Sequence, residues 1–332
     1  MHALTHRRFG RASEVLRLVE IETPVPRTGE VLVRVEASSA DPYDWHFIRG
    51  EPWFMRLGPG GLRRPRHPVP GGDFAGVVAA VGSGDVGDLA VGDEVYGFSH
   101  GAFAEYVRAP HGRVAKRPAG TSWEEAASLP LAAATAWQGL KRVGRLEAGQ
   151  KVLIIGASGG IGTLAVQMAA AWGAEVTGVC GSPNLDLART LGTDHVIDYR
   201  TEDYLRGIDR YDLVFQLGGT ASPLAIRRVL TDEGTLVQCA GDGSRALGPV
   251  PNVVLAMAMN RFVDQTLALV STVEDTATLE AVREMVESGQ LRPVVDHVVA
   301  FADAGLAVDE VETGSPRGKI AIGGYGREVP ST

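Results

Sequence analysis

The sequence predicts an α/β protein that combines a doubly wound parallel-sheet domain with a second, barrel-like β domain. Three observations support this fold class. The first 120 residues contain short β-like runs separated by Gly/Pro turns, helical spacing begins near residue 122, and apolar and helical runs alternate over residues 151–238. Turn-bounded short runs are typical of an antiparallel β domain. Regular alternation of strand and helix is typical of a parallel sheet covered by helices.

The elements also suggest where the two domains meet. Helical spacing begins at Trp123, with Thr121 or Ser122 as a candidate cap, so we place the boundary near residue 122. Two late β-like runs, 294–301 and 318–322, are candidates to rejoin the first domain. We therefore expect a β domain over 1–122, completed by about 291–332, and a parallel-sheet domain over 123–290.

A glycine-rich turn joins a predicted strand to a predicted helix in the second domain. It reads Gly156-Ala157-Ser158-Gly159-Gly160-Ile161-Gly162, between the apolar run 151–155 and the helical run 163–171, and a β-like run at 175–180 completes a βαβ unit. Backbone N–H groups at such a helix N-terminus can approach a pyrophosphate, and the helix dipole favours its charge. Because Ala157 replaces the first glycine of the common Gly-x-Gly-x-x-Gly fingerprint, an ordinary glycine-rich turn is the alternative. We expect a dinucleotide site.

The end of the second strand of this unit bears on the choice of dinucleotide. An NAD site usually has Asp or Glu there to bind the ribose 2′-hydroxyl. This chain instead has Ser182 and Asn184, which can donate hydrogen bonds to a 2′-phosphate. Arg or Lys usually marks a strong phosphate site, and the nearest, Arg189 and Arg200, lie farther along the chain. We expect NADPH in preference to NADH.

Composition excludes several classes of protein. The 332 residues include 32 basic and 40 acidic side chains, and the formal net charge of −8 argues against nucleic-acid binding through phosphate neutralisation. Residues 1–8 lack the apolar core of a signal peptide, and polar residues and glycines interrupt the most apolar region, 152–181. We therefore expect no membrane span. Only Cys180 and Cys239 are present, which fits a reducing cytoplasm.

Seven segments, in order and spacing, resemble the medium-chain dehydrogenase/reductase superfamily, and within it the zinc-independent quinone oxidoreductases related to zeta-crystallin. Besides the glycine turn, they are residues 37–46, 70–78, 91–97, 101–107, 194–199 and 317–320. The resemblance covers nearly the whole chain. It implies a GroES-like β domain with a Rossmann domain, an active site in the cleft between them, and a homodimer formed at the Rossmann edge.

The same fold occurs in zinc-dependent alcohol dehydrogenases, whose metal site this sequence does not reproduce. A catalytic zinc ion needs about three Cys, His or carboxylate ligands, and a structural one needs four. The first domain has no Cys, Asp41 stands where the resemblance places the first catalytic Cys, and Gly72-Asp73 stands in place of a His-Glu pair. The histidines of this domain lack ligand spacing: His46, His67, His100 and His111. We expect no zinc. The Tyr-x-x-x-Lys pair of short-chain dehydrogenases is also missing.

Chemistry without a metal narrows the expected reaction. Oxidation of a simple alcohol would lack a Lewis acid for the developing alkoxide. Hydride addition to a quinone or to the β-carbon of an enone is easier, because the charge spreads over a conjugated system. We therefore expect an NADPH-dependent reductase of small apolar quinones or α,β-unsaturated carbonyl compounds. A metal-free alcohol or aldehyde dehydrogenase and a non-catalytic NADPH-binding protein stay open as alternatives.

The candidate catalytic residues are Asp41, Tyr43 and His46, on one predicted loop. Asp41 occupies a position that is usually Asn in related reductases. Ionised Asp accepts hydrogen bonds but cannot donate them, so Asp41 is protonated, has another role or only caps the following turn. Tyr43 or His46 can donate a proton after hydride transfer, with water as the alternative donor. The pocket candidates are Trp45, Trp53 and Phe54, together with the apolar run 253–262, which can equally be core or a dimer contact.

The resemblance implies further cofactor contacts. It places Thr135 near the nicotinamide, Tyr199 near the adenine or its 2′-phosphate, and Gly218 and Gly241 at close backbone approaches. It also places Lys319 near the cofactor, although a solvated charge at a strand end is the alternative reading. Leu185 stands where some relatives have Lys, which weakens the case for NADPH.

Overall fold

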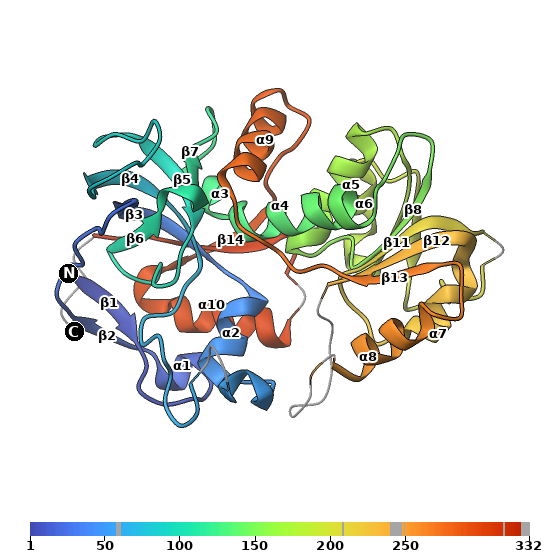
Figure 1. Ribbon diagram of the computed structural model, residues 1–332, viewed down its shortest axis with the longest axis horizontal. Helices are drawn as coiled ribbons and strands as arrows, with labels where there is room; N and C mark the ends of the chain where they lie inside the picture. Colours follow the sequence, from blue (N-terminus) through green and yellow to red (C-terminus); the bar gives the residue numbers. More distant parts are fainter. Residues whose placement is uncertain (58–60, 208, 240–247, 249, 315, 327–332) are drawn as a thin grey trace. The chain divides into compact units, whose positions relative to one another are not determined.

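The computed structural model describes residues 1–57, 61–207, 209–239, 248, 250–314 and 316–326. The chain forms two compact units, a first unit of residues 1–131, 274–289 and 293–332 and a second unit of residues 132–273 and 290–292. The first unit is built on an antiparallel β-sheet and the second on a parallel one (Figure 1). The predicted fold class is therefore confirmed.

The main sheet of the first unit has seven strands in the order β14-β15-β3-β4-β5-β7, with β6 paired to β3. Among the described strands of this sheet, β14 and β15 pair in parallel and the other pairs are antiparallel. On β3, Val31, Val33 and Val35 are buried on one face of the strand, and Arg34 on the opposite face is exposed. The strands are β3 (Glu30–Ala40), β4 (Asp73–Val81), β5 (Glu94–Phe98), β6 (Tyr106–Pro110), β7 (Val114–Lys116), β14 (Val295–Ala300) and β15 (Lys319–Gly323), and β1 (His2–Thr5) pairs with β2 (Arg17–Glu20) in a separate sheet.

Helices of the first unit pack on these strands. Helix α3 begins after Ser122, whose Oγ accepts a hydrogen bond from the Glu125 N–H at 3.1 Å, so Ser122 is the cap. Because α3 packs on β3, β4 and β15, the first unit extends beyond residue 122. The helices are α1 (Ala12–Val15), α2 (Pro42–Arg49), α3 (Trp123–Ala127), α9 (Thr276–Glu287) and α10 (Ala304–Thr313), with 3-10 turns η1 (Trp53–Leu57), η2 (His111–Arg113) and η6 (Phe301–Asp303).

The prediction of a loop around residues 43–46 is wrong, because these residues belong to helix α2. Asp41 takes an extended conformation at the N-cap, and Pro42 occupies the first helical position, where its missing N–H does no harm. Gly50 ends the helix with a left-handed φ of 62°. The side chains of Tyr43 and His46 are therefore held on a regular helix.

The second unit contains a six-stranded parallel sheet in the order β10-β9-β8-β11-β12-β13. The central strands have apolar middles, as expected for a sheet covered on both faces; on β8, Val152, Leu153 and Ile154 are fully buried. Helices α5 and α6 lie along one face and α7 and α8 along the other (Figure 1). The strands are β8 (Lys151–Ile155), β9 (Glu175–Cys180), β10 (His195–Asp198), β11 (Tyr211–Gln216), β12 (Leu230–Gln238) and β13 (Thr266–Leu269), and the helices are α5 (Gly160–Ala171), α6 (Leu185–Thr190), α7 (Pro223–Ile226) and α8 (Val250–Met259).

One helix changes form along its length. It is an α-helix over α4 (Pro130–Trp137) and continues as a π-helical segment, η3 (Gln138–Val143). Gly139 lies in this segment, and a Cβ there would come within 2.3 Å of the Phe215 ring. The wider turn is therefore packed tightly against β11. None of the described helices combines the length and apolar composition needed to cross a membrane.

Candidate functional site

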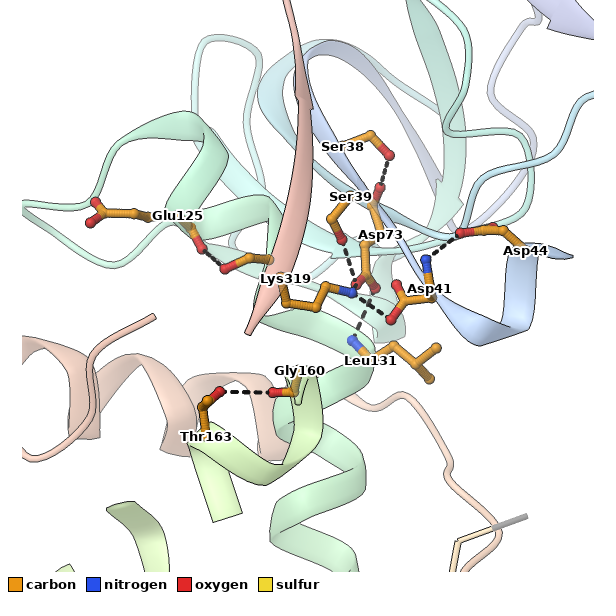
Figure 2. Close-up of polar contacts among 11 residues, drawn as sticks. Ser38, Ser39, Asp41, Asp44, Asp73, Glu125, Leu131, Gly160, Thr163 and Lys319 are labelled. Atoms are coloured by element: carbon orange, nitrogen blue, oxygen red, sulfur yellow. Dashed lines mark hydrogen bonds and ion pairs between the residues drawn. The ribbon is translucent and has the colours of Figure 1, made fainter. Parts of the chain in front are cut away.

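A buried group of charges lies at one end of the main sheet of the first unit. The ammonium of Lys319, the first residue of β15, donates to Asp41 Oδ1 and lies 3.3 Å from Asp73 Oδ2 (Figure 2). The side chain of Lys319 is 5% exposed, that of Asp41 7% and that of Asp73 0%. Lys319 is therefore not a solvated charge at a strand end.

Both oxygens of the Asp73 carboxylate accept hydrogen bonds. Oδ1 accepts from the Leu131 N–H at 2.9 Å and Oδ2 from Ser39 Oγ at 3.1 Å. Ser38 Oγ donates to the backbone carbonyl oxygen of Asp73 at 2.6 Å. Buried polar groups of this kind need partners, because desolvation is otherwise uncompensated. Asp73 therefore joins β3, β4 and the start of α4 around one side chain (Figure 2).

A third carboxylate lies beside this ion pair. Asp44 Oδ2 accepts from the Asp41 N–H at 2.9 Å, whereas Asp44 Oδ1 and Asp41 Oδ2 have no hydrogen-bond partner among the described residues. We call Asp41, Asp44, Asp73 and Lys319 the charge cluster. Three carboxyl groups share a single ammonium, so the cluster cannot keep all of them ionised.

The pKa values of the charge cluster follow from this imbalance. Burial and the neighbouring Asp41 raise the pKa of Asp44 to about 8. The same two causes raise the pKa of Asp73 well above its ordinary value. Burial alone would lower the pKa of Lys319, but Asp41 and Asp73 outweigh it and raise that pKa. Near neutral pH, Lys319 is therefore charged and Asp44 is protonated.

Tyr43 projects from α2 into a recess of the first unit. Its Oη lies 2.7 Å from His100 Nδ1, and its ring packs against Phe47 and Phe98 at centroid distances of 4.4 and 5.4 Å. The recess and the open solvent at its mouth together hold about 340 Å³ of empty space. Burial and Asp44 raise the pKa of Tyr43 above its ordinary value, so the phenol stays protonated and can donate.

The other residues expected around the substrate differ in their surroundings. His46 Nδ1 lies 2.7 Å from the Glu51 carbonyl oxygen, so this nitrogen faces the backbone. Trp45 packs against the core of the first unit, and Trp53, in η1, is 55% exposed. Phe54 belongs to η1, but its side chain lies outside the described residues. Of this group, Tyr43 alone lines the recess.

The glycine turn has the predicted strand-turn-helix form. Gly156 has a φ of 95°, Gly159 is the N-cap of α5, and a Cβ on Gly162 would come within 2.0 Å of the Gly156 carbonyl oxygen. Ala157 is fully buried, and Gly160 and Ile161 begin the helix. Thr163 Oγ1 donates to the Gly160 carbonyl oxygen at 3.1 Å (Figure 2). The turn therefore presents the N-terminus of a twelve-residue helix at the carboxyl end of β8.

The end of β9 has polar partners that the sequence did not reveal. Ser182 Oγ donates to Asp198 Oδ2, and Asn184 Nδ2 donates to Ser158 Oγ at 3.1 Å. Hydrogen bonds from Ser182 and the Arg200 N–H hold the pKa of Asp198 below its usual range. The expectation that no carboxylate stands at this strand end is therefore wrong for the folded chain. Parallel pairing aligns Asp198 of β10 with Cys180 of β9, which brings its side chain to the same sheet edge.

The same strand end also has a cation. A Cβ on Gly181 would lie 3.3 Å from Tyr199 Oη and 3.4 Å from Arg200 Nε, so both side chains reach the last turn of β9. Tyr199 is 52% exposed. Arg200 is 16 positions from Asn184 in the sequence, and Asp198 is 16 positions from Ser182. The pairing of β9 with β10 brings both Arg200 and Asp198 to the end of β9.

Three further expected cofactor residues belong to the second unit. Thr135 is buried, and its Oγ1 lies 2.8 Å from Thr272 Oγ1. The Gly218 N–H lies beside the glycine turn, because a Cβ on Gly156 would be 3.5 Å from it. A Cβ on Gly218 itself would meet nothing within 4 Å, so the backbone is open there. Gly241 lies outside the described residues.

Comparison with known proteins identifies the class. The family model of the alcohol dehydrogenase GroES-like domain matches residues 27–119, and that of the zinc-binding dehydrogenase matches residues 191–322. A chloroplastic quinone-oxidoreductase homolog of Spinacia oleracea is 31% identical over 97% of this chain and 98% of its own. The 2-methylene-furan-3-one reductase of Solanum lycopersicum is 31% identical over 97% of this chain and 79% of its own.

Solved structures agree with these matches. The quinone oxidoreductase from Coxiella burnetii superposes with a TM-score of 0.84 at 27% identity, covering 98% of this chain and 99% of that one. A mycobacterial protein solved in complex with NADPH superposes with a TM-score of 0.82 at 26% identity, covering 98% and 100%.

The two units and the glycine turn, together with these matches, define a medium-chain dehydrogenase/reductase. Within that superfamily the chain belongs to the zinc-independent quinone oxidoreductase-like family, as predicted. These matches also show that the protein is an oxidoreductase that uses a nicotinamide cofactor. The glycine turn fits such a cofactor, because it presents the N-terminus of α5 and the backbone at Gly218 beside it is open.

Zinc does not fit the corresponding residues. The first unit has no Cys, and the ammonium of Lys319 holds oxygens of both Asp41 and Asp73. Among the described residues, one group of His, Cys or carboxylate side chains is compact enough to share an ion, the exposed Asp296, His297 and Glu310. Both ring nitrogens of His297 already face carboxylates, at 3.5 and 3.4 Å.

Proposed function

We propose that this protein is a zinc-independent, NADPH-dependent reductase of quinones or α,β-unsaturated carbonyl compounds. The observation that supports it best is the ion pair of Lys319 with Asp41 and Asp73, at the positions where a zinc site would be expected. An internal ammonium offers no open coordination position for a substrate oxygen. Hydride addition to a conjugated acceptor needs only orientation and hydrogen-bond donors. The relatives named as a quinone-oxidoreductase homolog and a 2-methylene-furan-3-one reductase point to the same substrates.

The proposed cofactor site is centred on the glycine turn. Backbone N–H groups of residues 156–162 face the pyrophosphate, with Thr135, Gly218 and Gly241 around the rest of the molecule. When bound, the reduced nicotinamide supplies the hydride. The protein's part is to orient the substrate and to deliver the proton that the reduced product takes up.

Tyr43 is the proposed proton donor, and Asp41 and His46 position it. The phenol of Tyr43 is protonated and half-buried in the recess, whereas His46 Nδ1 faces the Glu51 carbonyl. Asp41 anchors the start of α2 through Lys319, which sets the direction in which Tyr43 projects. Trp45, Trp53 and Phe54 are proposed to shape the apolar part of the substrate pocket.

The NADPH preference is proposed to depend on Arg200. Its guanidinium is near Gly181, can pair with a 2′-phosphate and offsets the negative charge of Asp198. Ser182, Asn184 and Tyr199 supply polar contacts. Changing Arg200→Gln should weaken NADPH binding about 10-fold or more and leave NADH binding nearly unchanged. The matched control is Arg189→Gln, because that guanidinium is exposed and pairs with Asp186. Equal loss for both cofactors in Arg200→Gln would contradict the assignment.

We also propose a cytoplasmic homodimer that binds no nucleic acid. An edge strand, β13, ends the parallel sheet of the second unit, and exposed apolar side chains surround it. A net charge of −8 does not favour binding to phosphates, and a chain with only two cysteines, of which Cys180 is buried, suits a reducing compartment.

The decisive experiment follows NADPH consumption with a panel of quinones and α,β-unsaturated ketones, with NADH in parallel and a chelator present throughout. Turnover that prefers NADPH and ignores the chelator would support the proposal. Measurable NADPH binding without turnover on any acceptor would overturn it in favour of a non-catalytic binding protein. Chelator-insensitive oxidation of an alcohol as the only activity would instead indicate a metal-free dehydrogenase.

A further inference from the structure

We propose that the hydroxyl of Tyr204 hydrogen-bonds the adenosine half of the dinucleotide, so that Tyr204 contributes to the binding of NADPH and NADH alike. Tyr204 comes from the segment that connects β10 to β11. The inference rests on the proposed function, because it adds a side chain to the proposed cofactor site. This side chain belongs neither to the glycine turn nor to the proposed contacts with the 2′-phosphate.

The ring of Tyr204 is anchored in the core of the second unit. It packs against an apolar cluster that includes Leu153 and Ile155 of β8 and Val214 of β11. Tyr204 is half-buried, and burial is the largest cause of the raised pKa of its phenol, followed by the charge of Asp203. The phenol therefore stays protonated at neutral pH and can both donate and accept a hydrogen bond.

The hydroxyl of Tyr204 lies at the carboxyl ends of β8 and β11. A Cβ on Gly219, three positions after β11, would be 3.6 Å from Tyr204 Oη and 3.9 Å from Cγ2 of Ile155, the last residue of β8. Gly219 itself is exposed. In the strand order β10-β9-β8-β11-β12-β13, β8 and β11 flank the point where the order reverses. Ligands of open parallel sheets bind in the crevice outside the carboxyl ends of the strands at this point.

This hydroxyl is available to a ligand. Within the described part of the chain, no side chain or backbone group forms a hydrogen bond with Tyr204 Oη. Tyr211 packs in the same apolar cluster but differs, because its side chain has a hydrogen bond with Thr177. A half-buried hydroxyl without a protein partner is satisfied by water or by a bound molecule.

The neighbours of Tyr204 along the chain assign its hydroxyl to the adenosine half. Tyr199 and Arg200 reach Gly181 at the end of β9, where the 2′-phosphate is proposed to bind. Tyr204, four positions after Arg200, reaches the end of β8, where the glycine turn begins. In NADPH the adenosine ribose joins the 2′-phosphate to the pyrophosphate. A hydroxyl between the two proposed phosphate sites therefore meets the adenosine half.

Ligand titrations test this contact without turnover. In Tyr204→Phe, the dissociation constants of NADPH, NADH and 2′,5′-ADP should each rise about 3- to 10-fold, because all three ligands contain adenosine. Arg200→Gln should instead spare NADH. Thermal unfolding of Tyr204→Phe without ligand should match that of the wild type, since the ring is kept and the lost hydroxyl has no protein partner.

Tyr211→Phe is the matched control. It removes a hydroxyl from the same apolar cluster, but Tyr211 begins β11, at the end opposite to Gly219, so its dissociation constants should equal those of the wild type. Unchanged affinities in Tyr204→Phe, equal losses in both variants, or a loss confined to the dinucleotides would overturn the inference and leave the proposed function standing. A wild-type protein that binds none of the three ligands would overturn the proposed function and this contact together.

Discussion

Lys319 and Asp73 are 246 positions apart in the chain, yet Lys319 Nζ lies 3.3 Å from Asp73 Oδ2. Both residues begin a strand, and β3 separates these two strands in the sheet. Asp41, at the end of β3, completes the contact through its own bond to Lys319. The charge cluster therefore ties three neighbouring strands together at one end of the sheet.

Removing the ammonium should destabilise the protein strongly. Lys319→Met leaves Asp41 and Asp73 buried without a counter-charge, and we expect the free energy of unfolding at neutral pH to fall by about 3–5 kcal/mol. Lys151→Met is the matched control, because Lys151 also begins a strand and pairs with Glu175, but their side chains are 43% and 39% exposed. The free energy of unfolding should change far less in that variant, because solvent screens an exposed ion pair. Urea unfolding measures both, and equal losses would show that burial of the pair does not matter.

The Asp44 carboxyl should make stability depend on pH. Its pKa is about 8 in the folded protein against 3.8 ordinarily, so the folded state holds the proton more tightly. This contribution is fully present below about pH 4 and is lost as pH rises through about 8, by up to about 1.4 kcal/mol per pH unit. Asp44→Asn keeps an acceptor for the Asp41 N–H but cannot titrate, so its stability should fall less between about pH 5 and 9.

Unfolding of both proteins across that pH range checks this prediction. The control is Asp186→Asn, whose side chain is 94% exposed, and it should preserve the wild-type pH dependence. The same pH dependence in Asp44→Asn as in wild type would mean that another group of the charge cluster holds the proton.

Alanine substitutions at two glycines of the turn should distinguish an effect on folding from an effect on cofactor binding. A Cβ on Gly162 would meet the Gly156 carbonyl oxygen at 2.0 Å, so Gly162→Ala should cost about 1–3 kcal/mol of stability and abolish NADPH binding. A Cβ on Gly159 would lie 3.6 Å from the same oxygen, an ordinary contact. Gly159→Ala should therefore fold normally yet bind NADPH more weakly, because the pyrophosphate needs close backbone approach. Thermal unfolding and NADPH titration measure the two effects, and wild-type affinity in Gly159→Ala would argue against this binding mode.

The proposed dimer can be tested at α8 and the residues that follow it. Met257 is 67% and Phe262 86% exposed, so the change of both to Glu should leave folding intact and shift a dimer to monomer in sedimentation experiments. Leu306→Glu is the control, on α10 of the first unit and 57% exposed, and should not change the assembly state. A wild-type protein that is monomeric at micromolar concentration would contradict the proposed dimer.

Local sequence signals predicted the second unit well. Strands β8 and β9 have the predicted bounds, and the glycine turn lies between β8 and α5 as expected. Each of these elements is recognised from a few consecutive residues, namely an apolar run, a glycine turn or a helical spacing. In the first unit, helix α2 was missed although Asp41-Pro42 is a start signal, because its few apolar residues lack a clear helical period.

The sequence by itself determined the family, the two kinds of domain and the dinucleotide turn, because each rests on residues close together in the chain. Only the tertiary structure decided that Lys319 pairs with Asp41 and Asp73, that Tyr43 meets His100, and that Asp198 and Arg200 lie at the end of β9. Strand order and register determine which distant segments become neighbours. Contacts between side chains that are far apart in the sequence follow from that arrangement and from no local pattern.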